Sequence, residues 1–202
     1  MAGGSGRIMA RIVVAVLAAC AFTFTVASPA SAATENIPPT TTVSVENPAA
    51  VAVDAAGETY VVSSNTKTVD VFDLAGNLIR SLAGSKTLLN APIGMTVDVN
   101  GYLYVANNAA VNAILVFAPG SGGDTAPVRV ISGSNTQLAG VRGLAVDAAG
   151  DIFAANFATW GGTITVYAPG AAGNVPPLRT ISGVRPDFPV RTMSTSGMGC
   201  ST

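Results

Sequence analysis

Apolar and polar positions alternate in short runs along residues 47–183, a pattern typical of half-buried β-strands. Residues 102–105 (Tyr-Leu-Tyr-Val) and 163–167 (Thr-Ile-Thr-Val-Tyr) also carry the β-branched and aromatic side chains that strands favour. Beyond residue 33 the sequence has no helical periodicity. The pattern therefore predicts an all-β fold.

One unit is written three times, with a period of about 45 residues. Each copy contains Val-Asp-x-x-Gly, in which the aspartate can accept a backbone N–H two residues on and the glycine supplies a positive φ. The aspartates are Asp54, Asp98 and Asp147. Each unit holds four β-type runs, and the third and fourth are joined by a tight turn at 73–77 or by longer loops at 118–127 and 168–177. We interpret the longer loops as insertions that a stack of equivalent units tolerates.

Four strands in a unit of this length are typical of one blade of a β-propeller. The sequence predicts three four-stranded antiparallel blades within 47–183. A closed ring has about 4–8 blades, so a partial or truncated ring is expected. The repeat restarts weakly after Gly183 and fails, which predicts an interrupted fourth blade and a disordered tail at 184–202. Residues 33–46 are predicted to be a linker that contains an extra strand at 40–45, laid on the outside of a blade or left unpaired.

The best-kept copy of the repeat runs from Pro92 to Asn107 and reads P-x-G-h-x-V-D-x-x-G-x-h-Y-V-A-N, where h is apolar. This pattern resembles the NHL-type repeat propellers, and the segments 132–138 and 166–170 are similar to those of bacterial exported members. Val141 departs from the proline of the pattern in the third copy. The resemblance implies a propeller whose relatives include histidine-dependent lyases and gluconolactonase-like enzymes that hold a divalent metal with carboxylates and asparagines.

The N-terminus has the three parts of an export signal. Arg7 and Arg11 precede an apolar run at 12–27, and Ala-Ser-Ala at 30–32 supplies the small residues that signal peptidase accepts. The run is shorter than the roughly 20 residues of a membrane span. We predict a signal peptide at 1–32, no stable membrane span and a secreted protein.

A lipid anchor is the alternative for this segment. Leu-Ala-Ala-Cys at 17–20 resembles a bacterial lipobox, which would anchor the chain through Cys20. The apolar run continues beyond this cysteine to Val26, whereas a lipobox usually closes the run. Ordinary cleavage is therefore favoured.

Composition excludes several function classes. The chain has 49% hydrophobic residues, which is enough for a core. Its net charge is −1 and its basic residues form no stripe along the sequence, so nucleic acid is excluded as a partner. It has no histidine, which removes the base or metal ligand of the lyase-like relatives. We predict no catalytic residue, no metal site and no cofactor.

Candidate binding residues lie where strands end in loops. Asn107 and Asn156 close the second strand of their units, and Trp160, the only tryptophan, lies in a loop that could stack a sugar or an aromatic group. The alternative is that both asparagines cap strand ends and that Trp160 packs on a neighbouring blade. The repeated Arg80, Arg129 and Arg179 are instead predicted to form a solvated edge that discourages sheet pairing.

These features predict a secreted, non-catalytic binding or scaffold module for an unidentified protein or polymer ligand. The alternatives are a metal-dependent hydrolase or lactonase of the gluconolactonase-like kind and an inactive truncated fragment. Three blades leave two apolar faces uncovered. Two chains could close a six-bladed ring with two-fold symmetry, and the competing expectation is an unstable fragment.

Overall fold

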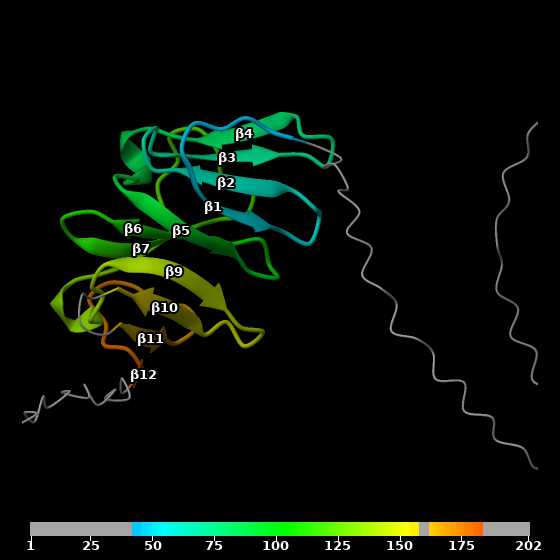
Figure 1. Ribbon diagram of the computed structural model, residues 1–202. Coiled ribbons are helices and arrows are strands. Elements are labelled where there is room, and N and C mark those ends of the chain that lie inside the picture. Colours follow the sequence, from blue (N-terminus) through cyan, green and yellow to red (C-terminus); the bar gives the residue numbers. More distant parts are fainter. Residues whose placement is uncertain (1–41, 158–161, 184–202) are drawn as a thin grey trace, which may run out of the picture. The chain divides into compact units, whose positions relative to one another are not determined.

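The computed structural model describes residues 42–157 and 162–183, which form three four-stranded antiparallel sheets (Figure 1). The first blade contains β1 (Pro48–Val53), β2 (Thr59–Ser63), β3 (Thr68–Phe72) and β4 (Leu78–Leu82). The second contains β5 (Pro92–Val97), β6 (Leu103–Asn108), β7 (Asn112–Phe117) and β8 (Arg129–Ser132). The third contains β9 (Val141–Val146), β10 (Ile152–Asn156), β11 (Thr163–Tyr167) and β12 (Arg179–Ser182).

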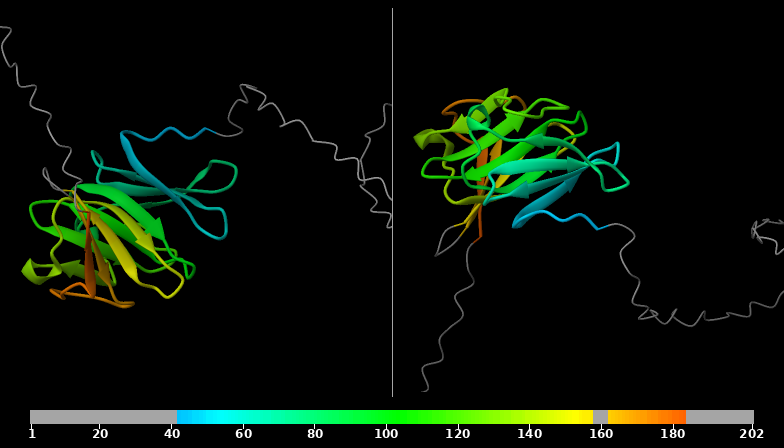
Figure 2. Two further views of the ribbon diagram at one scale, coloured as in Figure 1. Left: turned by 60° about the horizontal axis from the view of Figure 1, so that its bottom comes forward. Right: turned by 90° about the horizontal axis from the view of Figure 1, so that it is seen from above.

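The predicted fold is confirmed: the described chain is a partial β-propeller of three blades, and the sheets do not close into a ring. Figure 2 shows the sheets side by side in chain order, with the inner strands β1, β5 and β9 adjacent. Short 3-10 helices, η1 (Ser85–Thr87) and η2 (Ser134–Thr136), lie between successive blades. Within the described residues no helix is long and apolar enough to cross a membrane.

The first two strands of each blade are joined by the repeated aspartate turn. In the second blade, Asp98 Oδ1 accepts the backbone N–H groups of Asn100 and Tyr102, both at 2.9 Å. Gly101 adopts φ 80°, a conformation that an L side chain rarely tolerates. The same bonds recur at Asp54 and Asp147. The prediction that these aspartates are turn formers is confirmed.

The core lies between the blades. We call the side of a sheet that faces the next blade its forward face, and the opposite side its rear face. The forward face of the first blade packs on the rear face of the second, and the members of this cluster include Tyr60, Val62, Val69, Leu103, Val105 and Phe117. A second cluster joins the forward face of the second blade to the third, and its members include Tyr104, Ile114, Ile131, Ile152 and Tyr167.

The long loops at 118–127 and 168–177, which we call clasp loops, hold each blade to the one before it. Gly123 forms a parallel bridge on the free edge of β4: its N–H donates to Ser81 O at 2.7 Å, and its carbonyl accepts from Ala83 N at 3.0 Å. Gly173 repeats this contact on β8. These loops are therefore more than tolerated insertions, since they cover an otherwise unpaired strand edge.

The residue after each clasp glycine adds a side-chain contact. Asp124 Oδ1 accepts the backbone N–H of Lys86 at 2.6 Å, and Asn174 Oδ1 accepts that of Asn135 at 2.7 Å. Both acceptors satisfy N–H groups in the first turn of the 3-10 helix that leads to the next blade. A Gly-Asp or Gly-Asn pair thus ties the loop to the preceding blade.

The clasp loops also correct the prediction for the arginines. Arg80 and Arg129 are half-buried, and only Arg179 is exposed. Gly122 of the first clasp loop lies over Arg80, since a Cβ placed on it would be 3.7 Å from Arg80 Cβ. The outer strands of the first two blades therefore do not form a solvated edge.

Several predictions fall on residues outside the described ranges: the signal peptide at 1–32, the anchor at Cys20, Trp160 and the tail at 184–202. The extra strand at 40–45 falls partly within them. Residues 42–45 form no strand ladder, so the described part of this segment is not a strand laid on a blade, and the unpaired form stays a prediction. Val43 instead lines a pocket with Thr59 and Phe72 of the first blade.

Candidate functional site

The two predicted asparagines are buried, with 5% of Asn107 and 6% of Asn156 exposed. Asn107 Oδ1 accepts the backbone N–H groups of Asn90 and Ala91 at 2.9 and 3.1 Å, and its Nδ2 donates to Leu88 O. Asn156 Oδ1 accepts the N–H of Ala139 at 3.1 Å. These amides fasten the segment that enters each blade, which is the supporting role weighed against ligand binding.

The same position in the first blade carries Ser63, whose hydroxyl donates to Glu46 O at 2.6 Å. A polar side chain at the end of the second strand therefore holds the entering chain in every blade. Because both amides point into these contacts, the structure presents neither Asn107 nor Asn156 as an open binding group. Their predicted partner, Trp160, lies outside the described residues.

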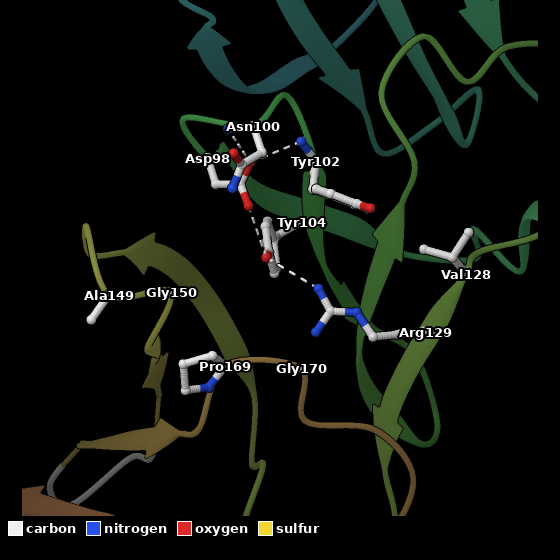
Figure 3. A pocket seen from close by; sticks show the side chains of 10 residues that line it. All are labelled: Asp98, Asn100, Tyr102, Tyr104, Val128, Arg129, Ala149, Gly150, Pro169 and Gly170. Carbon is white, nitrogen blue, oxygen red and sulfur yellow. Dashed lines mark hydrogen bonds between the residues drawn. The ribbon is translucent and has the colours of Figure 1, made fainter.

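A pocket of about 450 Å³ lies at the opposite ends of the strands, between the second and third blades (Figure 3). One wall comes from the aspartate turn and outer strand of the second blade, and includes Asn100, Tyr102 and Arg129. The other wall comes from the third blade, through the turn at 149–150 and the clasp-loop residues 169–170. The repeat thus builds this pocket from two turns, one clasp loop and the outer strand of the second blade.

A chain of hydrogen bonds crosses the pocket wall (Figure 3). Arg129 Nη2 donates to the Tyr104 hydroxyl at 3.2 Å, and this hydroxyl donates to Asp98 Oδ2 at 3.2 Å. The guanidinium carbon also lies 6.0 Å from the centre of the Tyr102 ring and 5.8 Å from that of Tyr104, within the range of a cation–π contact. Burial raises the pKa of Tyr104, while the bond from Arg129 opposes this shift.

The equivalent position between the first and second blades has a different charge balance. Arg80 forms a bidentate ion pair with Glu58, and Nη2 also donates to the Tyr60 hydroxyl at 3.4 Å. Tyr102 occupies the place of Glu58 in the second repeat, so Arg129 has no carboxylate within ion-pair distance among the described residues. Its Nη1 is buried and lacks a hydrogen-bond partner there, as does Nε of Arg80 in the first blade.

Sequence reasoning missed Arg129 and Tyr102 as candidate binding residues. The signal that could have found them is the residue two places before the repeated aromatic, which is Glu58 in the first copy and Tyr102 in the second. The arginine is kept in both repeats, so Arg80 retains the carboxylate of Glu58 as its partner, whereas Arg129 faces Tyr102 instead. Comparison of the repeats shows the exchange of Glu58 for Tyr102, but only the fold shows that this position lies beside the repeated arginine.

Buried tyrosines make the stability of the fold sensitive to alkali. Burial, with the charge of Asp54 next in size, raises the pKa of Tyr60 to about 12 from 10.0. The pKa values of Tyr104 and Tyr167 are raised in the same direction, mainly by burial. Because the unfolded phenols ionise first, we expect their contribution to stability to be complete below pH 10 and to disappear between pH 10 and about 12.

Urea unfolding followed by circular dichroism at a series of alkaline pH values measures this loss. The Tyr60→Phe variant cannot ionise at that position, so its unfolding midpoint should fall less steeply than that of the unchanged protein over the same interval. Equal slopes for the two proteins would contradict the assignment to Tyr60.

The carboxylates are engaged in structure rather than gathered in one place. One oxygen of each repeat aspartate accepts two backbone N–H groups. The other oxygen of Asp54 and of Asp98 accepts a hydrogen bond from a tyrosine hydroxyl. Asp70 accepts from the Ser81 hydroxyl at 2.6 Å. Within 42–157 and 162–183, no three acidic or cysteine side chains form a group that could hold a metal ion.

No protein-family model matches the sequence, and comparison with curated proteins gives no significant match. Among solved structures, a protein of unknown function from Bacteroides caccae is similar at 17% identity and a TM-score of 0.45, over 66% of this chain and 45% of that one. Virginiamycin B lyase from Staphylococcus aureus is similar at 11% and 0.43, over 62% and 44%. A streptogramin B lyase is similar at 14% and 0.42, over 62% and 42%. The chain spans less than half the length of each.

Proposed function

We propose that this protein is a secreted, NHL-type propeller that serves as a non-catalytic binding or scaffold module for a protein or polymer ligand. The observation that carries the proposal is the use of the repeat aspartates. Asp54, Asp98 and Asp147 each hold a turn through two bonds of 2.9 Å. The Oδ1 atom of each repeat aspartate is therefore committed to the scaffold, which argues against a metal or substrate role for that atom.

Export is part of the proposal and rests on the sequence. Two arginines, an apolar run and a small-residue segment follow one another within residues 1–32, in the order that a signal peptide requires. The absence of histidine from the whole chain supports a non-catalytic role, since the lyase-like relatives named by the resemblance depend on imidazole.

Association of a further blade is also proposed. The forward face of the third blade exposes Ile164 and Ile181 by 38% and 47%. At the position of Ile181, the first two blades carry Leu82 and Ile131, which are 1% and 0% exposed beneath the next blade. A second copy of the chain is one source of such a cover.

A metal titration separates the proposed binding module from a metal-dependent hydrolase. We expect calcium or zinc ions to leave the thermal midpoint of the purified chain unchanged, because the acidic groups of its described residues form no cluster that could hold a metal ion. A ligand that binds only the folded state raises the midpoint with its concentration. A saturable rise with either ion would therefore overturn the non-catalytic proposal in favour of the hydrolase.

A further inference from the structure

The pocket between the second and third blades holds polar groups that the fold itself does not use. Arg129 Nη1 is buried without a partner, and within the described residues the half-buried Tyr102 hydroxyl and the exposed Asn100 side-chain amide make no hydrogen bond. All three side chains line the same pocket (Figure 3). A buried donor without a partner loses its hydration and gains nothing in return, which favours any ligand that supplies an acceptor.

The charge of the pocket is set by the exchange of Glu58 for Tyr102 between repeats. In the first blade the acid neutralises Arg80 directly. In the second blade the carboxylate of Asp98, which also lines the pocket, is linked to Arg129 through the Tyr104 hydroxyl, and its other oxygen accepts two backbone N–H groups. The guanidinium therefore keeps its capacity for one further anionic partner, and a carboxylate matches its planar donor geometry.

The rest of the pocket suits a ring that carries hydroxyl groups. The Tyr102 ring is half-buried and borders the cavity, and Val128 and Pro169 add apolar surface. The Asn100 amide and the Tyr102 hydroxyl can each donate and accept hydrogen bonds, as sugar hydroxyls require. The volume of about 450 Å³ lies within the range of small-molecule sites.

We propose that this pocket binds an acidic sugar unit of the uronic acid class, with its carboxylate on Arg129, its ring against Tyr102 and its hydroxyl groups toward Asn100. Arg129 lines the cavity, and the proposal requires its side chain to rotate so that the buried Nη1 meets the incoming carboxylate. The inference rests on the proposed binding function and identifies its ligand class as an acidic polysaccharide. It also places the binding surface at the opposite ends of the strands from Asn107 and Asn156.

Calorimetric titration of the purified chain with glucuronate tests this proposal, with glucose and inorganic phosphate as comparison probes. We expect glucuronate to bind more tightly than either, because glucose lacks the charge and phosphate lacks the ring. Equal affinity for glucose, tighter binding of phosphate, or no binding of glucuronate would each overturn the proposal.

Two variants locate the site. Tyr102→Glu recreates the ion pair of the first blade and should weaken glucuronate binding roughly tenfold or more, since it supplies an internal carboxylate to Arg129. Arg129→Gln should have a similar effect through loss of the cation. Leu74→Glu adds the same charge at a side chain that is 78% exposed in another blade, so it should leave the affinity unchanged.

Thermal melts of all three variants keep the result interpretable, because a folded Tyr102→Glu protein that binds glucuronate as before would contradict the site. Failure of this inference is distinct from failure of the binding function. A chain that ignores both glucuronate and metal ions loses only the ligand assignment, whereas stabilisation by calcium or zinc removes the non-catalytic function itself.

Discussion

Replacing Ile131 with alanine is expected to lower the free energy of unfolding by about 2–5 kcal/mol, the usual cost of a truncation that leaves a cavity in a core. Ile131 is fully buried, at 0% exposure, in the cluster that joins the second and third blades. Ala171 and Val175 of the clasp loop pack against this same cluster. The truncation therefore weakens both the contact between the blades and the loop that covers it.

Ile181→Ala is the matched control, because it makes the same chemical change at the same repeat position. Ile181 is 47% exposed and has no following blade among the described residues. We expect its loss to stay within about 0.5 kcal/mol, as at other surface positions. Urea unfolding of both variants at low and high protein concentration measures the difference. An equal loss for Ile181→Ala would contradict this and would show that another surface covers the third blade in solution.

The strands and their grouping could be predicted from the sequence because local signals specify them. The alternation of apolar residues fixes which side of a strand is buried, and the Asp-x-x-Gly turn fixes where adjacent strands reverse. In the structure Asp98 accepts two backbone N–H groups and Gly101 adopts a positive φ, as the sequence predicts for these residue types. The blades followed from repetition of these signals.

The clasp loops could not be predicted in this way, because their role depends on a neighbour. Gly123 bonds to Ser81 and Ala83, which belong to the preceding blade and lie about forty residues earlier in the chain. Nothing local separates such a loop from an inserted surface loop. The missing information was the free edge of β4, which exists only once the sheets are assembled.

The structural role of the two predicted asparagines was missed for a related reason. A strand end followed by a loop is a common place for binding residues, and this favoured Asn107 and Asn156 as ligands. The structure shows that the entering backbone itself presents donors at that point, and a buried amide is the side chain that satisfies them. Arg129 was set aside because a repeated charge on an outer strand is usually solvated. The loop that buries it was not recognised as a cover.

Gly94→Ala is expected to destabilise the protein by about 3 kcal/mol, the upper part of the range for overpacked sites. Gly94 lies on the inner strand β5, where the backbone of β9 approaches most closely. A Cβ at this position would overlap the carbonyl group of Arg142. Since that group belongs to the backbone, no change of rotamer can remove the overlap, and the third blade must move away from the second.

Gly143→Ala shows whether the contact between blades, and not the glycine itself, carries this effect. Gly143 holds the same repeat position in β9, and its Cβ would meet only Ala155 Cβ, at an ordinary 3.5 Å. Neither glycine has a positive φ, so alanine is compatible with the backbone at both sites. The substitution therefore brings the same gain in stability at each site, because alanine makes the unfolded chain less flexible. We expect Gly143→Ala to be neutral or more stable by up to about 1 kcal/mol, and urea unfolding of the two variants gives the comparison. The two changes in unfolding free energy have opposite signs only if the blades meet at Gly94 and the forward face at Gly143 is open. Equal losses of stability would mean that both glycines face a further blade.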